Sequence, residues 1–114
     1  MADTPETSQG GGYEVRVLPV AAEDLLEARD YIAGRLGVPR AASRLVDQVE
    51  ETLRSLEHMP YRHRIYPATH PTEYEVRFGC VGDYLLLYWV DDVEHWVIVA
   101  RFVYGGHQVE RFIR

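Results

Sequence analysis

The sequence predicts an α+β domain in which a two-helix hairpin packs on one face of an antiparallel sheet of at least four strands. Two amphipathic segments, 21–36 and 40–57, follow each other closely, and each carries one apolar stripe. Two runs of almost continuous apolar and aromatic residues, 84–90 and 96–104, suit strands that are covered on both faces. Two striped helices can lie together on one sheet face, so the expected element order is β-αα-βββ.

The start of the chain lies outside this predicted fold. Residues 1–12 contain no apolar run and end in three glycines, so we expect a disordered tail there and a single domain over 13–114. No apolar run approaches the ~18 residues of a membrane span, and no signal-peptide pattern is present. The single cysteine, Cys80, allows no internal disulfide. We therefore expect a cytoplasmic protein that does not act at a membrane.

The first strand is expected at 13–18, where apolar and polar residues alternate. Pro19 ends this strand and can open a helix. The first helix has its stripe at spacings of three and four residues, interrupted by Arg29: Leu25, Ala28, Ile32 and Leu36. Gly34 and Gly37 stop this helix.

The second helix is expected to begin after Pro39 and to end before Pro60. Its apolar stripe comprises Ala42, Leu45, Val46, Val49, Leu53 and Leu56. Because only three or four residues separate the two helices, we expect them to form an antiparallel hairpin.

Three strands are expected after the loop 60–72, in which residues 65–66 can pair briefly. Alternation over 73–78 predicts a half-buried strand, and Gly79 together with Gly82 marks the turn that follows it. The two apolar runs then form the central strands. Asp91 and Asp92 start the turn between them, because aspartate side chains can bond the backbone two residues on.

The charge pattern limits the classes of partner. The net charge is −6, and a chain this acidic is a poor general binder of nucleic acid. All twelve basic residues are arginines, seven of them within 35–77, so a local arginine site could still bind RNA. The absence of lysine has two explanations: planar recognition of phosphate or carboxylate, or the base composition of the genome.

The order of strand, helix hairpin and three-stranded meander resembles the RelE/ParE superfamily of toxins from type II toxin–antitoxin modules. Four segments carry the resemblance: 22–26 with the following Tyr31-Ile32, 41–56 with Met59-Pro60, 84–88, and 98–104 with its glycine turn. The similarity extends from Tyr13 to Ile113. The helix hairpin looks most like the ParE-like branch, whose members are often called plasmid stabilisation proteins.

The resemblance implies a growth-inhibiting toxin that is neutralised by a cognate antitoxin and acts on DNA gyrase or a similar target. Two alternatives remain open: a RelE-like endoribonuclease that cleaves mRNA on the ribosome, and a non-catalytic binding module on the same fold. The partner segment is expected to cross the helix hairpin and the sheet and to bury at least ~1,000 Å². We expect no cofactor and no metal, since His58, His63 and His70 match no zinc motif.

If the chain cleaves RNA, it needs an acid, a base and cations around the phosphate. The candidates on or just after neighbouring strands are Arg77, Tyr104 and His107, with His107 as the acid–base group. A structural explanation competes with this one. Arg77 could pair with Glu73 or Glu75, and Tyr104 could lie at the edge of the core.

Further arginines are candidate contacts to a target or a phosphate: Arg62, Arg64, Arg101 and Arg111. A solvated loop would equally explain Arg62 and Arg64. Strand alternation places Arg101 on the face of Val97, Val99 and Val103, which the helices would cover.

Two positions depart from the RNase relatives. Leu85 and His107 stand where those relatives tend to carry arginine. Because preorganised cations are usually the largest stabilising term for such a transition state, we expect at best a weak nuclease. A binding poison that uses His107 and Arg77 for recognition fits the sequence better.

Overall fold

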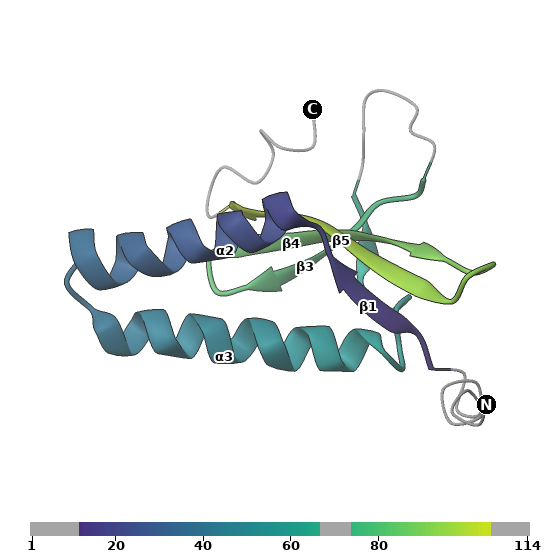
Figure 1. Cartoon of the computed structure of the whole chain (residues 1–114), viewed down its shortest axis with the longest axis horizontal. Helices are drawn as coiled ribbons and strands as arrows, with labels where there is room; N and C mark the ends of the chain where they lie inside the picture. Colours follow the sequence, from purple (N-terminus) through teal and green to yellow (C-terminus); the bar gives the residue numbers. More distant parts are fainter. Residues whose placement is uncertain (1–11, 67–73, 106–114) are drawn as a thin grey trace.

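The computed structural model describes residues 12–66 and 74–105 (Figure 1). The predicted tail, apart from Gly12, therefore lies outside the described residues, and so do 67–73 and 106–114. The helices are α2 (Pro19–Asp30), the π-helical turn η1 (Tyr31–Arg35) and α3 (Pro39–Leu56). The strands are β1 (Glu14–Val17), β2 (Arg64–Ile65), β3 (Arg77–Val81), β4 (Tyr84–Asp91) and β5 (Trp96–Tyr104).

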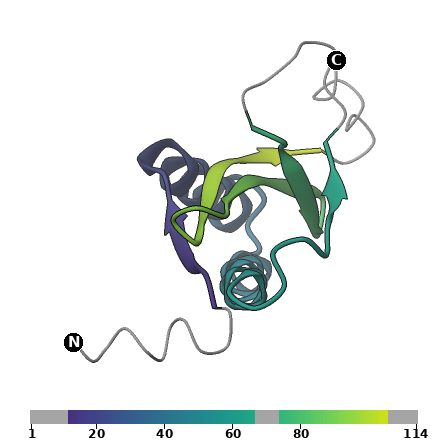
Figure 2. The same ribbon diagram turned by 90° about the vertical axis from the view of Figure 1, so that its right-hand side faces the viewer.

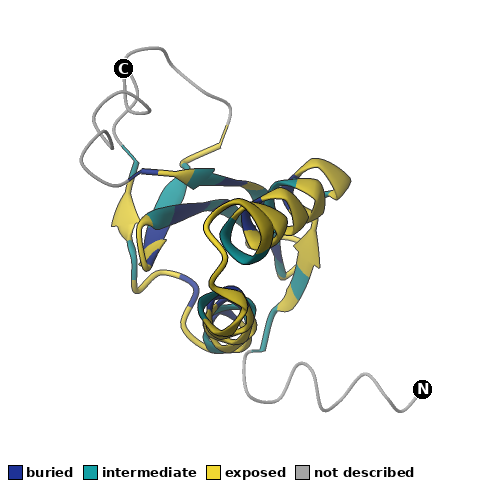
Figure 3. Ribbon diagram, turned by 90° about the vertical axis from the view of Figure 1, so that its left-hand side faces the viewer, coloured by how far each residue is buried: buried dark blue, intermediate teal, exposed yellow. Residues whose placement is uncertain are grey.

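The five strands form one sheet in the order β1-β5-β4-β3-β2. Neighbouring strands from β2 to β5 are antiparallel, whereas β1 pairs with β5 in parallel. Both helices lie on the same side of this sheet (Figures 2 and 3). The predicted α+β architecture is confirmed, with a short extra strand β2 and one parallel pair.

The core fills the space between the helices and the sheet. Its most completely buried large side chains are Tyr88, Leu56, Leu86 and Val97. Helix α3 contributes a buried stripe at Ala42, Leu45, Val49 and Leu56, as its spacing predicts. The outer surfaces of both helices are exposed (Figure 3). Buried apolar area between these two layers is the main source of stability.

The helix hairpin turns differently from the prediction. Helix α2 ends at Asp30, and the chain continues as a π-turn closed by Leu36 N–H, which donates to Tyr31 C=O at 3.0 Å. Gly37 then adopts a φ of +69°, a conformation that favours glycine. The wider turn rotates Leu36 out of the predicted stripe, and this side chain is exposed rather than buried.

Gly79 was predicted to form part of a turn, and this prediction is wrong. Gly79 lies inside β3, opposite Leu86. A Cβ atom at this position would come within 3.1 Å of the His63 ring, so the glycine leaves room for that ring. Gly82, with a φ of +59°, does lie in the turn that follows, as predicted.

The predicted face of Arg101 is also wrong in part. The pairing of β4 with β5 shifts between Leu87 and Tyr88, so that Arg101 lies opposite Leu87 while Val99 lies opposite Tyr88. This bulge reverses the alternation along β5. Val97 and Val99 face the helices and are buried, whereas Arg101 is exposed and its side chain reaches the edge of α2 at Asp24.

Candidate functional site

The two ends of the sheet differ in how their polar groups are used. We call the end where Arg77 lies opposite Tyr88 the closed end, and the end where Tyr104 lies opposite Tyr84 the open end. Helix α3 and the loop after it adjoin the closed end, while the tip of the helix hairpin overhangs the open end (Figure 1).

Arg77 is held at the closed end by several partners at once. Its Nη1 donates to the His63 carbonyl at 2.8 Å, and its Nη2 pairs with Glu75 Oε1 at 3.1 Å. The guanidinium carbon lies 4.9 Å from the centre of the Tyr61 ring. The side chain is only 14% exposed. Of the catalytic and the structural explanations for Arg77, the structural one is supported, since the pairing with Glu75 is present. Arg77 links the loop after α3 to the sheet.

A carboxylate joins three segments beside Arg77. Asp92, in the turn between β4 and β5, accepts hydrogen bonds from the hydroxyls of Tyr61 and Tyr13, the latter at 2.8 Å. These two bonds hold the pKa of Asp92 below its usual range. Burial, and then the bond to Asp92, raises the pKa of Tyr61 to about 12. The cluster therefore ties the start of β1, the loop after α3 and the β4–β5 turn together.

Tyr88 and His63 complete the packing of the closed end. The buried Tyr88 hydroxyl donates to the Pro60 carbonyl at 2.6 Å, and the His63 ring meets the Tyr88 ring edge-on at 6.0 Å between centres. Burial, and secondarily the charge of Arg62, lowers the pKa of His63. The imidazole is thus neutral near pH 7, and its half-buried ring packs against Tyr88 rather than acting as a cation.

A groove opens at the other end of the sheet. Its volume is about 690 Å³. Residues from the hairpin tip and from the ends of β4 and β5 line it: Tyr31, Ile32, Leu36, Val38, Ala41, Asp83, Tyr84 and Tyr104. Tyr104 meets Tyr84 edge-on at 5.5 Å between ring centres, and 53% of Tyr104 is exposed. The lining is mostly apolar and aromatic, which is typical of a binding surface.

The structure does not bring the candidate catalytic residues together. Arg77 and Tyr104 lie on strands either side of β4, at the levels of Tyr88 and Tyr84 respectively. The two residues are therefore separated by about 13 Å along the strand direction, four residue steps of β4, and by roughly 9–10 Å across the sheet, two strand spacings. His107 and Arg111 lie outside the described residues, so their places relative to these two remain predictions.

Arg101 is engaged with helix α2. Its Nε and Nη2 donate to the two carboxylate oxygens of Asp24, at 2.7 and 3.1 Å, and the Phe102 N–H donates to the same carboxylate at 3.0 Å. Burial disfavours the charge on Asp24, but the bonds from Arg101 and Phe102 outweigh it and lower the pKa of this carboxyl. Arg101 is therefore a bound partner of Asp24 rather than a free phosphate contact.

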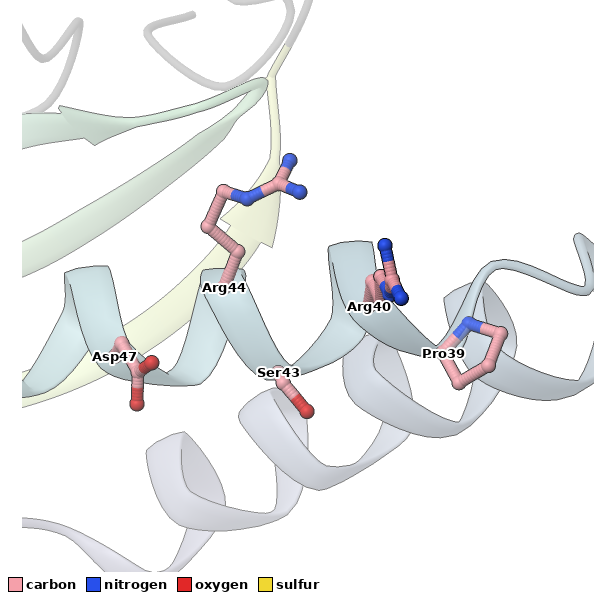
Figure 4. A pocket seen from close by; sticks show the side chains of 5 residues that line it. All are labelled: Pro39, Arg40, Ser43, Arg44 and Asp47. Carbon is pink, nitrogen blue, oxygen red and sulfur yellow. The ribbon is translucent and has the colours of Figure 1, made fainter.

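Of the remaining candidate arginines, the described ones, Arg62 and Arg64, are exposed. Arg64 belongs to the short edge strand β2, and Arg62 lines a shallow hollow between α3 and the following loop. A second hollow on α3 contains Arg40 and Arg44, which point to one side of the helix while Ser43 points to the other (Figure 4). The hollow beside Arg62 also contains Glu51, and the hollow on α3 also contains Asp47, and these carboxylates oppose the binding of a phosphate.

Two further features of the described residues bear on function. Nowhere in 12–66 and 74–105 do three His, Cys, Asp or Glu side chains gather in a way that could hold a metal ion. His70, one of the three histidines considered from the sequence, lies outside this part. No helix in the same part is long and apolar enough to cross a bilayer.

Comparison with known families decides the classification. The profile of the family described as ParE toxin of type II toxin-antitoxin system, parDE, matches residues 15–108. The chain belongs to this family of toxins. No curated protein sequence matches the chain.

Solved structures with the same fold come from related toxin–antitoxin systems. The chromosomal ParDE system from P. aeruginosa superposes with a TM-score of 0.65 and 18% identity over 82% of this chain and 97% of that one. The RelBE2 toxin–antitoxin complex from Mycobacterium tuberculosis gives 0.53 and 24%, over 82% and 98%. The archaeal RelE–RelB complex from Pyrococcus horikoshii OT3 gives 0.58 and 15%, over 83% and 97%. The RelE/ParE fold expected from the sequence is therefore confirmed.

The groove was not predicted from the sequence. Its lining comes from two regions that are far apart in the chain and meet only in the fold. One local signal was available. Tyr31, Leu36 and Val38 are large apolar residues at a helix–helix turn, where polar residues are the norm, and all three are exposed. Exposed apolar side chains at a turn indicate a surface that is covered by something else.

Proposed function

We propose that this ParE-family chain acts in the cytoplasm as a binding poison of DNA gyrase or a similar machine, without cleaving RNA. A cognate antitoxin holds it inactive until that partner is removed. The proposal joins family membership, which rests on the match over residues 15–108, to the geometry of the arginines on the sheet.

The engagement of Arg77 and Arg101 carries this proposal. Each guanidinium on β3 and β5 is bound within the chain, Arg77 by His63 and Glu75 and Arg101 by Asp24. An RNase transition state needs cations aimed at the phosphate, and a cation already held by a carboxylate is partly neutralised. Leu85, at a position where RNase relatives tend to carry arginine, is buried and supplies no charge. The described sheet thus favours binding over phosphate chemistry.

The antitoxin part of the proposal rests on the relatives. The structures with the same fold from M. tuberculosis and P. horikoshii are described as toxin–antitoxin complexes. In this chain the helix hairpin and the sheet leave exposed apolar side chains at the open end, among them Leu36 and Tyr104. An antitoxin segment that covers this region would remove apolar area from water and bury at least ~1,000 Å².

The mechanism is tested by two assays on the same purified protein. We expect the protein to inhibit DNA supercoiling by gyrase. We expect it to leave mRNA intact on translating ribosomes. Mapping of mRNA ends provides the second readout, and Arg54→Gln, at an exposed position of α3, serves as a surface control that should behave as the parent. Cleavage of mRNA on the ribosome that disappears in His107→Ala would overturn the proposal in favour of a RelE-like nuclease. No effect in either assay would instead favour a non-catalytic binding module.

The antitoxin is tested by co-expression with the product of the neighbouring gene. We expect the two proteins to co-purify and growth arrest to be relieved. If the neighbouring product does neither, the partner assignment is wrong, whatever the outcome of the gyrase assay.

A further inference from the structure

His63 attaches the segment between α3 and β2 to the sheet through both its side chain and its main chain. We call this segment, residues 57–63, the linking segment. The His63 ring lies against β3, where a Cβ atom on Gly79 would come within 3.1 Å of it, and it meets the Tyr88 ring edge-on. The His63 carbonyl accepts the hydrogen bond from Arg77 Nη1 at 2.8 Å. The place of the linking segment therefore depends on how well this ring fits against the sheet.

One nitrogen of the His63 ring is buried without a partner. Nε2 makes no hydrogen bond to any of the described residues. A neutral imidazole needs a proton on only one nitrogen, so Nε2 can remain an unused acceptor while Nδ1 carries the proton. The imidazolium carries a proton on both nitrogens, and Nε2 would then become a buried, charged donor without an acceptor. The fitted position of the ring therefore suits the neutral form alone.

Neighbouring arginines also oppose a positive charge on His63. Arg62 precedes it and Arg64 follows it in the chain, while Arg77 reaches its carbonyl. Burial, and then the charge of Arg62, lowers the pKa of the imidazole. A proton on His63 would thus add charge beside groups of the same sign.

The other elements packed against His63 offer little compensation. Helix α3 places Glu51 in the same hollow as His63, together with Thr52 and Ser55. Among the described residues, however, no ion pair joins Glu51 to His63. From β4 the facing polar group is the Tyr88 hydroxyl, and burial raises its pKa to about 12, so this group is uncharged near neutral pH.

We propose that His63 is a proton-operated latch. The neutral ring holds the linking segment on the sheet, and the protonated ring releases this segment together with the hydrogen bond between its carbonyl and Arg77. Release would leave Arg77 paired with Glu75, whose side chain is 57% exposed, and such exposed pairs are weak. The guanidinium would then be available to an anion. This inference concerns the free chain and does not rest on gyrase or on an antitoxin.

The direction of the pH effect follows from the lowered pKa of His63. The unfolded ring titrates near its ordinary value of about 6.5, and the fitted ring titrates below that value. The stability that the latch contributes is therefore complete above about pH 6.5 and is lost as pH falls through the folded pKa. Between the two values, release becomes up to about tenfold easier for each unit of pH. Carboxyl groups of ordinary pKa titrate lower, near pH 4, so their effects fall outside this window.

The test follows hydrogen exchange in the full chain. Tyr66 N–H, next to the linking segment, donates to the Val76 carbonyl of the chain leading into β3 at 2.6 Å and reports release. Its protection factor, which is corrected for the intrinsic effect of pH on exchange, should fall about threefold or more from pH 7 to pH 5. Leu18 N–H, which donates to the Val99 carbonyl on another part of the sheet, should keep its protection.

Variants of two histidines separate the latch from other effects of acid. His63→Phe keeps a ring beside Gly79 but cannot take up a proton, and His63→Gln replaces it if the larger ring does not fit. In either variant the protection of Tyr66 should be the same at pH 7 and pH 5. His58→Gln, at an exposed histidine of the same linking segment, is the matched control and should keep the fall seen in the parent.

The release of Arg77 has its own readout. The Nε–H signal of Arg77 should shift when inorganic phosphate is added at pH 5, and should not shift at pH 7. An unchanged protection of Tyr66 between pH 7 and pH 5 in the parent would overturn the latch, and so would a fall that persists in both His63 variants. Silence of the Arg77 signal at pH 5 would overturn the release of this arginine.

Discussion

The closed and open ends of the sheet use the same residue types in opposite ways. At the closed end, Arg77, Tyr61 and Tyr88 each bond to a partner within the chain. At the open end, Tyr31 and Tyr104 are about half exposed beside a groove. An arginine with tyrosines around it indicates a catalytic centre only when its hydrogen bonds remain available to a substrate. The comparison therefore assigns stability to the closed end and binding to the open end.

The largest difference between the two ends is expected when one tyrosine is removed from each, Tyr88 from the closed end and Tyr104 from the open end. Tyr88→Ala leaves a cavity in the core and an unpaired Pro60 carbonyl, and should lower the free energy of unfolding by about 3–5 kcal/mol. Tyr104→Ala should lower it by about 1 kcal/mol or less, because half of the ring is already in water. Urea unfolding followed by circular dichroism measures both. If the alanine variant of Tyr88 does not fold, Tyr88→Phe should still cost about 1 kcal/mol.

Arg77 provides the second contrast. Arg77→Met keeps the length of the side chain but leaves the His63 carbonyl without its partner, so we expect a loss of about 1–3 kcal/mol in unfolding free energy. Arg62→Met, on the exposed loop, should change it by less than about 0.5 kcal/mol. Equal stability of the two variants would show that Arg77 is not a structural fastener and would return it to the catalytic candidates.

Acid should weaken the contact between Asp24 and β5. The folded-state pKa of Asp24 lies below its ordinary value, so its contribution is complete above the unfolded pKa of about 3.9 and is lost as pH falls through the folded pKa. Asp24→Asn should cost about 1 kcal/mol at pH 7, and the difference from the parent should shrink as the pH falls below about 4. Thermal unfolding across pH 2–7 checks this, and a difference that is constant with pH would contradict it.

The smallest expected effect concerns Tyr61. Because its folded pKa is raised to about 12, the stability that it contributes is present below about pH 10 and is lost as pH rises towards 12. Absorbance at 295 nm should show that Asp92→Asn moves the ionisations of both Tyr61 and Tyr13 to lower pH, because both hydroxyls donate to Asp92. Tyr61→Phe should remove the Tyr61 ionisation alone, and an unchanged titration in both variants would argue against the Tyr61–Asp92 bond.

Most of the fold could be predicted because its signals are local. The run of β-branched and aromatic residues at 96–104 coincides with β5, and the spacing of apolar residues in 40–57 differs by one residue at each end from α3. The face of Arg101 could not be predicted in the same way. It depends on a bulge in the pairing with β4, and strand alternation contains no signal for an extra residue.

The sites were harder to predict than the fold. Whether Arg77 is available depends on a carbonyl fourteen residues earlier, and the pairing of Arg101 joins residues 77 positions apart. Candidate roles based on residue type could therefore name these arginines but could not establish that their hydrogen bonds were already in use. His107 and Arg111 lie outside the described residues and stay predictions.

The bond from Phe102 N–H to Asp24 has a consequence for self-association. Strand β1 pairs with β5 only as far as Val99, so among the residues that the structure describes no strand covers this edge of the last, largely apolar part of β5. Such an edge is a template on which a strand of another molecule can add, the first step of aggregation. The Asp24 carboxylate occupies the Phe102 N–H and places a charge beside this edge, with Arg101 next to it. Asp24 on α2 thus disfavours the pairing of strands from other molecules with the exposed end of β5.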